Sequence, residues 1–246
     1  MNIPEAAERP RRKPRAEVNG WINLDKPVGV TSTQAVGRLK HLFNARKAGH
    51  AGTLDPLASG VLPVAFGEAT KTVPVVQDGL KSYSFAVRWG VETDTDDAEG
   101  RAVARSDARP EAAAIAAILP RFTGVIAQTP PTYSAIKIGG ERAYDLARDG
   151  AAFAIAAREI VVHRLELVAH GGEVSTFEAE CGKGAYVRAL ARDLGRALGC
   201  YGHVSLLRRT RVGPFAAEDG VTFPTLEQGP EALAAALLGI EAGLAE

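Results

Sequence analysis

Short segments in which apolar and polar residues alternate recur along most of the chain, and this period of two is typical of half-buried β-strands. The apolar pattern first appears near Trp21, where the sequence WINL predicts a short strand. The sequence VLPVAF at 61–66 is almost wholly apolar and predicts a buried strand. Further strands are expected at 81–90, 159–168, 173–181 and 203–212, the second and third of them paired across a turn at Gly171-Gly172.

Other segments carry apolar residues at intervals of three and four, which is the period of an amphipathic helix. A helix capped by Thr31 or Ser32 is expected to run to about Phe43. Shorter helices are expected at 110–119 and 141–148, and an Ala/Leu-rich helix at 233–244. The clearest helix runs from Tyr186 to Leu198, with its inward face made of Val187, Leu190, Leu194 and Leu198. Intermixed strands and helices indicate an α+β fold, with a mixed, largely antiparallel central sheet flanked by helices.

Three regions follow from the same pattern. Residues 1–19 combine prolines and arginines without any apolar period, and are expected to form a disordered basic arm. Residues 20–212 form the folded domain, and residues 213–246 form a short acidic, helical tail. The glycine-rich stretch at 48–60 is too irregular for a helix or a strand, so we interpret it as a loop.

The net charge of the chain is zero, but the charges are unevenly distributed. Residues 1–50 and residues 181–212 each carry a net charge of +6, whereas residues 213–246 carry −6. The two basic segments could meet in space and form a phosphate-binding face. Ordinary solvated surface charge accounts for the same counts equally well.

Cysteine usage and hydropathy narrow the class of protein. Cys181 and Cys200 have neither the CxxC nor the Cys/His spacing of a zinc site, and no disulfide framework is indicated. With no signal peptide and no long apolar run, the expected location is the cytoplasm, without a membrane contact. The acidic run Asp94, Asp96, Asp97 and Glu99 lacks the glycine and the distant glutamate of an EF-hand, and is interpreted as a solvated turn.

One loop contains the residue types that chemistry needs. In GHAGTLDPLASG (49–60), small residues surround His50 and Asp55, and Pro56 biases Asp55 toward an extended conformation. A carboxylate held in this way could serve as a nucleophile or a general base. Taken alone, the same residues favour a turn-forming aspartate before proline. Arg188, Arg192 and Arg196, spaced four apart, are likewise more typical of a solvated helix face.

A set of segments in order changes this interpretation. The chain closely resembles the TruB family of tRNA pseudouridine synthases over roughly residues 20–212. The resemblance rests on LDKPVGVTS (24–32), AGHAGTLDPLASGVLPVAFGEATK (48–71), KSYSF (81–85), TYSAIKIGGERAYDLARDG (132–150), GAYVRALARDLG (184–195) and HVSLLRR (203–209). It implies the pseudouridine synthase fold, with a thumb-like RNA-binding insertion at about 129–157.

The resemblance implies that the chain isomerises the T-loop uridine at tRNA position 55 without a cofactor or a metal. Asp55 would be the catalytic carboxylate, and Arg188 would hold it bidentately and offset the effect of burial on its pKa. Tyr83 would stack on the target base and could help to remove the C5 proton. Arg192 and Arg196 keep the interpretation of a solvated face or of phosphate contact.

Further residues would bind the substrate by the same resemblance. His50 would fill the space that the flipped base leaves. Tyr186 and Leu207 would line the uridine pocket, and Lys26 and Lys137 would also contact the RNA. Lys137 belongs to the insertion, where basic and aromatic residues are interleaved.

The expected partner is therefore the T arm of tRNA, bound by a monomer that needs no other protein. Many bacterial members carry a small β-rich domain after the catalytic one, and the 34 residues after Val212 are too few for it. Two other classes of function stay open. One is an RNA chaperone that uses the same surface. The other is a hydrolase in which an aspartate activates water, although no metal ligands or second carboxylate accompany it.

Overall fold

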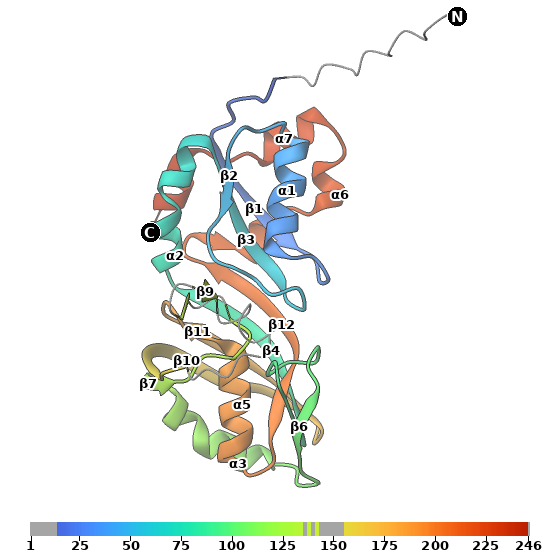
Figure 1. The fold of residues 1–246 in the computed structure, drawn as a ribbon, viewed down its shortest axis with the longest axis vertical. Coiled ribbons are helices and arrows are strands. Elements are labelled where there is room, and N and C mark those ends of the chain that lie inside the picture. Colours follow the sequence, from blue (N-terminus) through green and yellow to red (C-terminus); the bar gives the residue numbers. More distant parts are fainter. Residues whose placement is uncertain (1–13, 135–136, 139–140, 143–154, 246) are drawn as a thin grey trace, which may run out of the picture.

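The computed structural model describes residues 14–134, 137–138, 141–142 and 155–245. Among them, nine strands form one sheet, shown in Figure 1. Its main path is, in spatial order, β1 (Gly20–Lys26), β3 (Ser59–Phe66), β12 (Gly202–Val212), β4 (Lys81–Trp89), β11 (Val174–Cys181), β10 (Arg158–His170) and β7 (Gly124–Gln128). Every pair is antiparallel except β12 with β3, which confirms the predicted mixed, largely antiparallel sheet.

Short strands complete the described β-structure. β2 (Ala48–His50) pairs with β3, and β13 (Phe215–Ala216) pairs with β12. Two hairpins stand apart from the sheet, one made of β5 (Val91–Thr93) and β6 (Ala102–Arg105), the other of β8 (Lys137–Ile138) and β9 (Glu141–Arg142).

Helices cover the sheet in two groups. Figure 1 shows α5 (Val187–Ala197) and α3 (Ala112–Ile118) at one end, and α1 (Ser32–Leu42), α6 (Phe223–Leu226) and α7 (Pro230–Ala236) at the other. The other helices among the described residues are α2 (Val73–Asp78) and the 3-10 helices η1 (Gly67–Lys71), η2 (Leu119–Phe122), η3 (Ala217–Asp219) and η4 (Ile240–Leu244). α5 packs on β12 and β4, so its buried face, which includes Leu190 and Leu194, joins the main core. None of the described helices is long and apolar enough to cross a bilayer.

The start of α1 follows the sequence closely. Thr31 is the N-cap, and its hydroxyl accepts a hydrogen bond from the Gln34 amide at 3.1 Å. The Gln34 side chain accepts in return from the Thr31 amide at 2.9 Å, which completes a capping box. Two donors at the helix end are thus satisfied by residues that lie three apart in the sequence.

Several local predictions are wrong. Residues 48–50 form β2 rather than loop, because their backbone pairs with β3. Residues 14–19, assigned to the arm, are ordered against the domain, and the Ala16 amide donates to Asn44 at 2.8 Å. Residues 141–142 lie in a strand rather than a helix, while 143–148 lie outside the described residues.

The tail also differs from its prediction. The helix expected at 233–244 ends at Ala236, and a separate 3-10 helix begins at Ile240. Between them Leu238 is extended and pairs with Trp21, with both N–H···O distances at 2.9 Å. The bonds to β1 replace the helical ones and dock the tail on the sheet.

Candidate active site

Asp55 lies in the loop that joins β2 to β3, and contacts from several elements hold this loop. The Ser32 hydroxyl at the start of α1 bonds both the amide and the carbonyl of Leu54, at 2.8 and 2.9 Å. The Gly29 amide donates to the Pro56 carbonyl at 2.7 Å. The backbone on each side of Asp55 is therefore fixed, while its side chain stays 34% exposed.

Arg188, in the first turn of α5, reaches this carboxylate. Its Nε lies 2.9 Å from Oδ2 of Asp55, and its side chain is only 6% exposed. The expected bidentate grip is wrong, because Nη1 donates instead to the Thr95 carbonyl at 3.0 Å and Nη2 to the Tyr133 carbonyl at 2.9 Å. Oδ2 of Asp97 lies 3.8 Å from Nη1 of Arg188. One guanidinium thus joins the Asp55 loop to two other chain segments.

The next two arginines of α5 also have carboxylate partners. Arg192 is buried rather than solvated, and its Nη1 lies 2.9 Å from Oδ2 of Asp96. Arg196 is partly exposed and grips buried Glu92 with two nitrogens, at 2.8 and 2.6 Å. The acidic run is therefore not a solvated turn, since Asp96 and Asp97 are buried. Burial raises the pKa of Asp96 to about 6, although Arg192 opposes the shift.

Tyr83 and Leu207 lie on adjacent central strands, and their cross-strand partners place them on one face. Tyr83 on β4 is opposite Arg209 on β12, and Leu207 is opposite Phe85. Burial raises the pKa of the Tyr83 phenol, while the neighbouring Arg209 guanidinium acts in the opposite direction. Arg209 was missed from the sequence. The signal was the tandem pair in HVSLLRR, because on a strand two adjacent arginines must face opposite sides.

Lys26 and His50 occupy the surroundings of the same loop. Lys26 is fully buried, and its Nζ donates to the carbonyls of Pro27 at 2.9 Å and Val30 at 2.7 Å. Burial lowers the pKa of Lys26 to about 8, an effect that nearby Asp55 opposes. Burial also lowers the pKa of His50, and within the described part of the chain its Nδ1 has no hydrogen-bond partner.

Tyr186 is the N-cap residue of α5, two positions before Arg188. The Gln128 side chain accepts from the Tyr186 amide at 2.9 Å and donates to its carbonyl at 3.1 Å, so this helix start is set from β7. The Arg158 guanidinium lies 5.5 Å from the Tyr186 ring centre. The Lys137 backbone belongs to β8, but its side chain lies outside the described residues.

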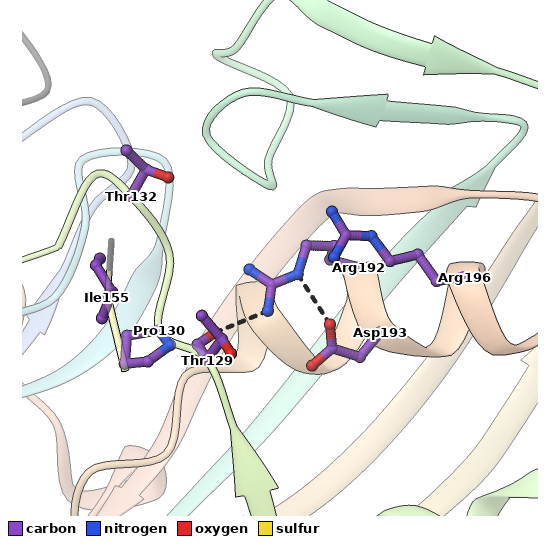
Figure 2. A pocket seen from close by; sticks show the side chains of 7 residues that line it. All are labelled: Thr129, Pro130, Thr132, Ile155, Arg192, Asp193 and Arg196. Carbon is purple, nitrogen blue, oxygen red and sulfur yellow. Dashed lines mark hydrogen bonds and ion pairs between the residues drawn. The ribbon is translucent and has the colours of Figure 1, made fainter. Parts of the chain in front are cut away.

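A pocket of about 270 Å³ lies between α5 and the base of the insertion. Figure 2 shows the Arg192 side chain with its contacts to Thr129 and Asp193. The lining consists of Thr129, Pro130, Thr132, Ile155, Arg192, Asp193 and Arg196. Because its arginines are paired with Asp96, Asp193 and Glu92, the pocket has no surplus of positive charge. Among the described residues, no group of three His, Cys, Asp or Glu side chains could hold a metal ion.

The fold has counterparts among solved structures. The chain superposes on a chain of the "Cbf5-Nop10-Gar1 Complex" with a TM-score of 0.72 and 31% identity, covering 91% of this chain and 61% of that one. A second match is to an "H/ACA RNP bound to a substrate RNA containing 2'-deoxyuridine", with a TM-score of 0.69 and 29% identity over 91% of this chain and 60% of that chain. The fold of this chain is therefore one that occurs in chains of these two complexes.

Family models and curated relatives narrow the class. A model described as "TruB family pseudouridylate synthase (N terminal domain)" matches residues 40–187. Proteins named tRNA pseudouridine synthase B are 62% identical in Rhodopseudomonas palustris and 61% in Bradyrhizobium diazoefficiens, covering 96% and 95% of this chain. The chain belongs to the TruB family of pseudouridylate synthases. It spans 66% and 70% of the length of those two relatives.

The C-terminal part also has a family match. A model described as "tRNA pseudouridylate synthase B C-terminal domain" matches residues 188–245. The boundary between the two models falls inside α5, immediately before Arg188, whereas the structure continues through α5 into the same sheet. The tail after Val212 is thus a segment that relatives share.

Proposed function

We propose that this chain converts uridine to pseudouridine in the T loop of tRNA, at tRNA position 55, with Asp55 as its catalytic carboxylate. The observation that carries the proposal is the Asp55–Arg188 pair, in which a fixed loop presents a partly exposed carboxylate 2.9 Å from a buried guanidinium. The names of the relatives supply the class of substrate.

The proposed reaction is an isomerisation whose atoms balance within the substrate, apart from one proton exchanged with solvent. The C1′–N1 bond breaks, the uracil turns, and C1′ joins C5. The C5 proton then leaves, and N1 takes one up. Asp55 either attacks C1′ or removes the C2′ proton to give a glycal intermediate. Both routes need an ionised carboxylate in a site that RNA closes to water, and the Arg188 guanidinium lies 2.9 Å from this carboxylate.

The remaining residues surround the base in this proposal. Tyr83 offers a flat face for the uracil, and Tyr186 and Leu207 complete the pocket. His50 fills the gap in the T loop after the uridine has flipped. Its lowered pKa favours a neutral ring, which is suited to stacking.

RNA contact extends beyond the base. Lys137 contacts the substrate, and the insertion at 129–157 closes over it. Lys26 was also expected to contact the RNA, but its side chain is fully buried and its ammonium donates to the carbonyls of Pro27 and Val30, so it holds the turn after β1 instead. Contacts at the start of the insertion support a link between it and the active site, because Arg188 donates to the Tyr133 carbonyl and Arg192 to the Thr129 carbonyl. The enzyme acts in the cytoplasm as a monomer and needs no partner protein, cofactor or metal.

Release of tritium tests the proposal. A tRNA transcript labelled at uridine C5 should lose label to water when incubated with the protein. Asp55→Ala should abolish release but keep tRNA binding, whereas Asp107→Ala, at an exposed aspartate, should match the wild type. Binding without any release by the wild type would instead indicate an RNA chaperone. Free uracil among the products would indicate a hydrolase.

A further inference from the structure

Arg209 is a buried cation whose three guanidinium nitrogens each donate to a backbone carbonyl. It is 3% exposed, and its Nε donates to Val61 at 2.9 Å, its Nη1 to Thr53 at 3.2 Å and its Nη2 to Gly52 at 3.0 Å. No described carboxylate lies within ion-pairing distance of it. Because a buried charge without a paired carboxylate is costly, the position needs a reason beyond stability.

The same residue holds both ends of the Asp55 loop. Its guanidinium binds Gly52 and Thr53, where the loop begins, and its backbone pairs in parallel with Gly60, where the loop ends. The approach at Gly60 is so close that a Cβ there would lie 2.2 Å from the Arg209 carbonyl oxygen. Gly60 also has φ +103°, which favours glycine. Arg209 therefore contacts both ends of the Asp55 loop, and we call this arrangement the clasp.

Its charge also reaches the other groups of the site. Tyr83 lies directly opposite on β4, and the guanidinium counteracts the effect of burial on the Tyr83 pKa. It adds to the effect of burial in lowering the pKa of His50 and of Lys26. Asp55 in turn favours the charged form of Arg209. The Arg209 guanidinium thus interacts with the Asp55 loop, with the Tyr83 phenol and with the Asp55 carboxylate.

We propose that Arg209 is a positioning residue for the isomerisation, which clasps the two ends of the Asp55 loop so that the carboxylate meets Arg188 and the target uridine. The inference rests on the proposed function. It assigns Arg209 to turnover rather than to RNA affinity, since its nitrogens are buried and donate to the carbonyls of Gly52, Thr53 and Val61.

The test compares Arg209→Lys and Arg209→Ala with Arg208→Gln. Arg208 is the neighbouring arginine, which faces the other side of the strand and pairs with Asp25 at 2.9 Å. The single-turnover rate at saturating tRNA, the Kd for tRNA and the melting temperature are measured for each. Arg209→Lys should lose about a hundredfold or more in rate with a Kd within about threefold of wild type, because one ammonium cannot reach three carbonyls. Arg208→Gln should keep the wild-type rate.

Chemical rescue separates positioning from a purely structural role. Millimolar guanidinium should restore part of the rate of Arg209→Ala, at least about tenfold, whereas methylammonium at equal ionic strength should not. If Arg209→Ala does not fold, the rate and Kd of Arg209→Lys decide the matter. Wild-type turnover in Arg209→Lys, or equal losses of rate and affinity with a lower melting temperature, would overturn the inference. An inactive wild type would overturn the proposed function instead.

Discussion

Replacing Arg188 by lysine tests how the Asp55 carboxylate is held. The guanidinium makes three contacts, at 2.9 Å to Asp55, 3.0 Å to the Thr95 carbonyl and 2.9 Å to the Tyr133 carbonyl. A lysine ammonium can keep the first but not all three directions. Two carbonyls then lose a charged donor, at about 1–3 kcal/mol each. If roughly 2–4 kcal/mol of that total is lost from the transition state, turnover falls between about thirtyfold and a thousandfold.

The assay is single-turnover tritium release at saturating tRNA, with the Kd measured separately. Arg192→Lys is the matched control, because Arg192 lies one turn further along α5, is equally buried and does not contact Asp55. It should lower stability but keep turnover within about threefold of wild type. Near-normal turnover by Arg188→Lys would refute the three-way geometry, and equal losses in both variants would show that turnover reports only on α5 packing.

The contacts and charges around the loop support three further predictions. The pKa of Lys26 is lowered from 10.5 to about 8, so between these pH values the unfolded chain binds more protons and stability rises with pH. Urea unfolding should show this gain in the wild type, on the order of 1–3 kcal/mol, but not in Lys26→Met; parallel curves would contradict it. Gly60→Ala should cost at least about 2 kcal/mol of stability, because its Cβ would meet the Arg209 carbonyl oxygen. Gly37→Ala, where a Cβ has open space, should be neutral or stabilising. Equal unfolding midpoints for the two variants would argue against the close approach of Gly60 to Arg209. Affinity for tRNA should fall as the KCl concentration rises. Arg196→Gln should change the slope of log affinity against log salt by much less than the roughly 0.9 of one phosphate contact, because Glu92 already neutralises Arg196. A change of a full unit in this slope would mean that Arg196 binds RNA.

Local patterns were sufficient for most of the regular structure. The strands β4, β10, β11 and β12 are half-buried, so their alternating residues show in the sequence, and α1 has its capping signal within four residues. β2 escaped detection because it is three residues long and rich in small side chains, and its pairing with β3 is what makes it a strand. The last helix was misplaced for a similar reason, since Leu238 bonds to Trp21, far away in the chain.

The site residues, too, were predictable only in part. The ordered motifs of the chain indicate Asp55, Arg188, Tyr83 and the other site residues, and the fold brings Asp55 and Arg188 into contact. Their roles in catalysis stay predictions. The three-way grip of Arg188 and the clasp by Arg209 could not be foreseen, because backbone carbonyls are present in every residue and leave no mark in the sequence.

The charged residues of α5 and of the acidic run show most clearly what only the tertiary structure decides. By itself the sequence determined the family, the α+β class and the presence of an arginine stripe and an acidic run. Each of these two looked solvated when considered separately, as most charged residues are. The fold packs α5 against the 92–97 segment, so that Arg192 meets Asp96, 96 residues away, and both become buried. A buried charge is stable only beside its partner, and only the tertiary structure decides which partner that is.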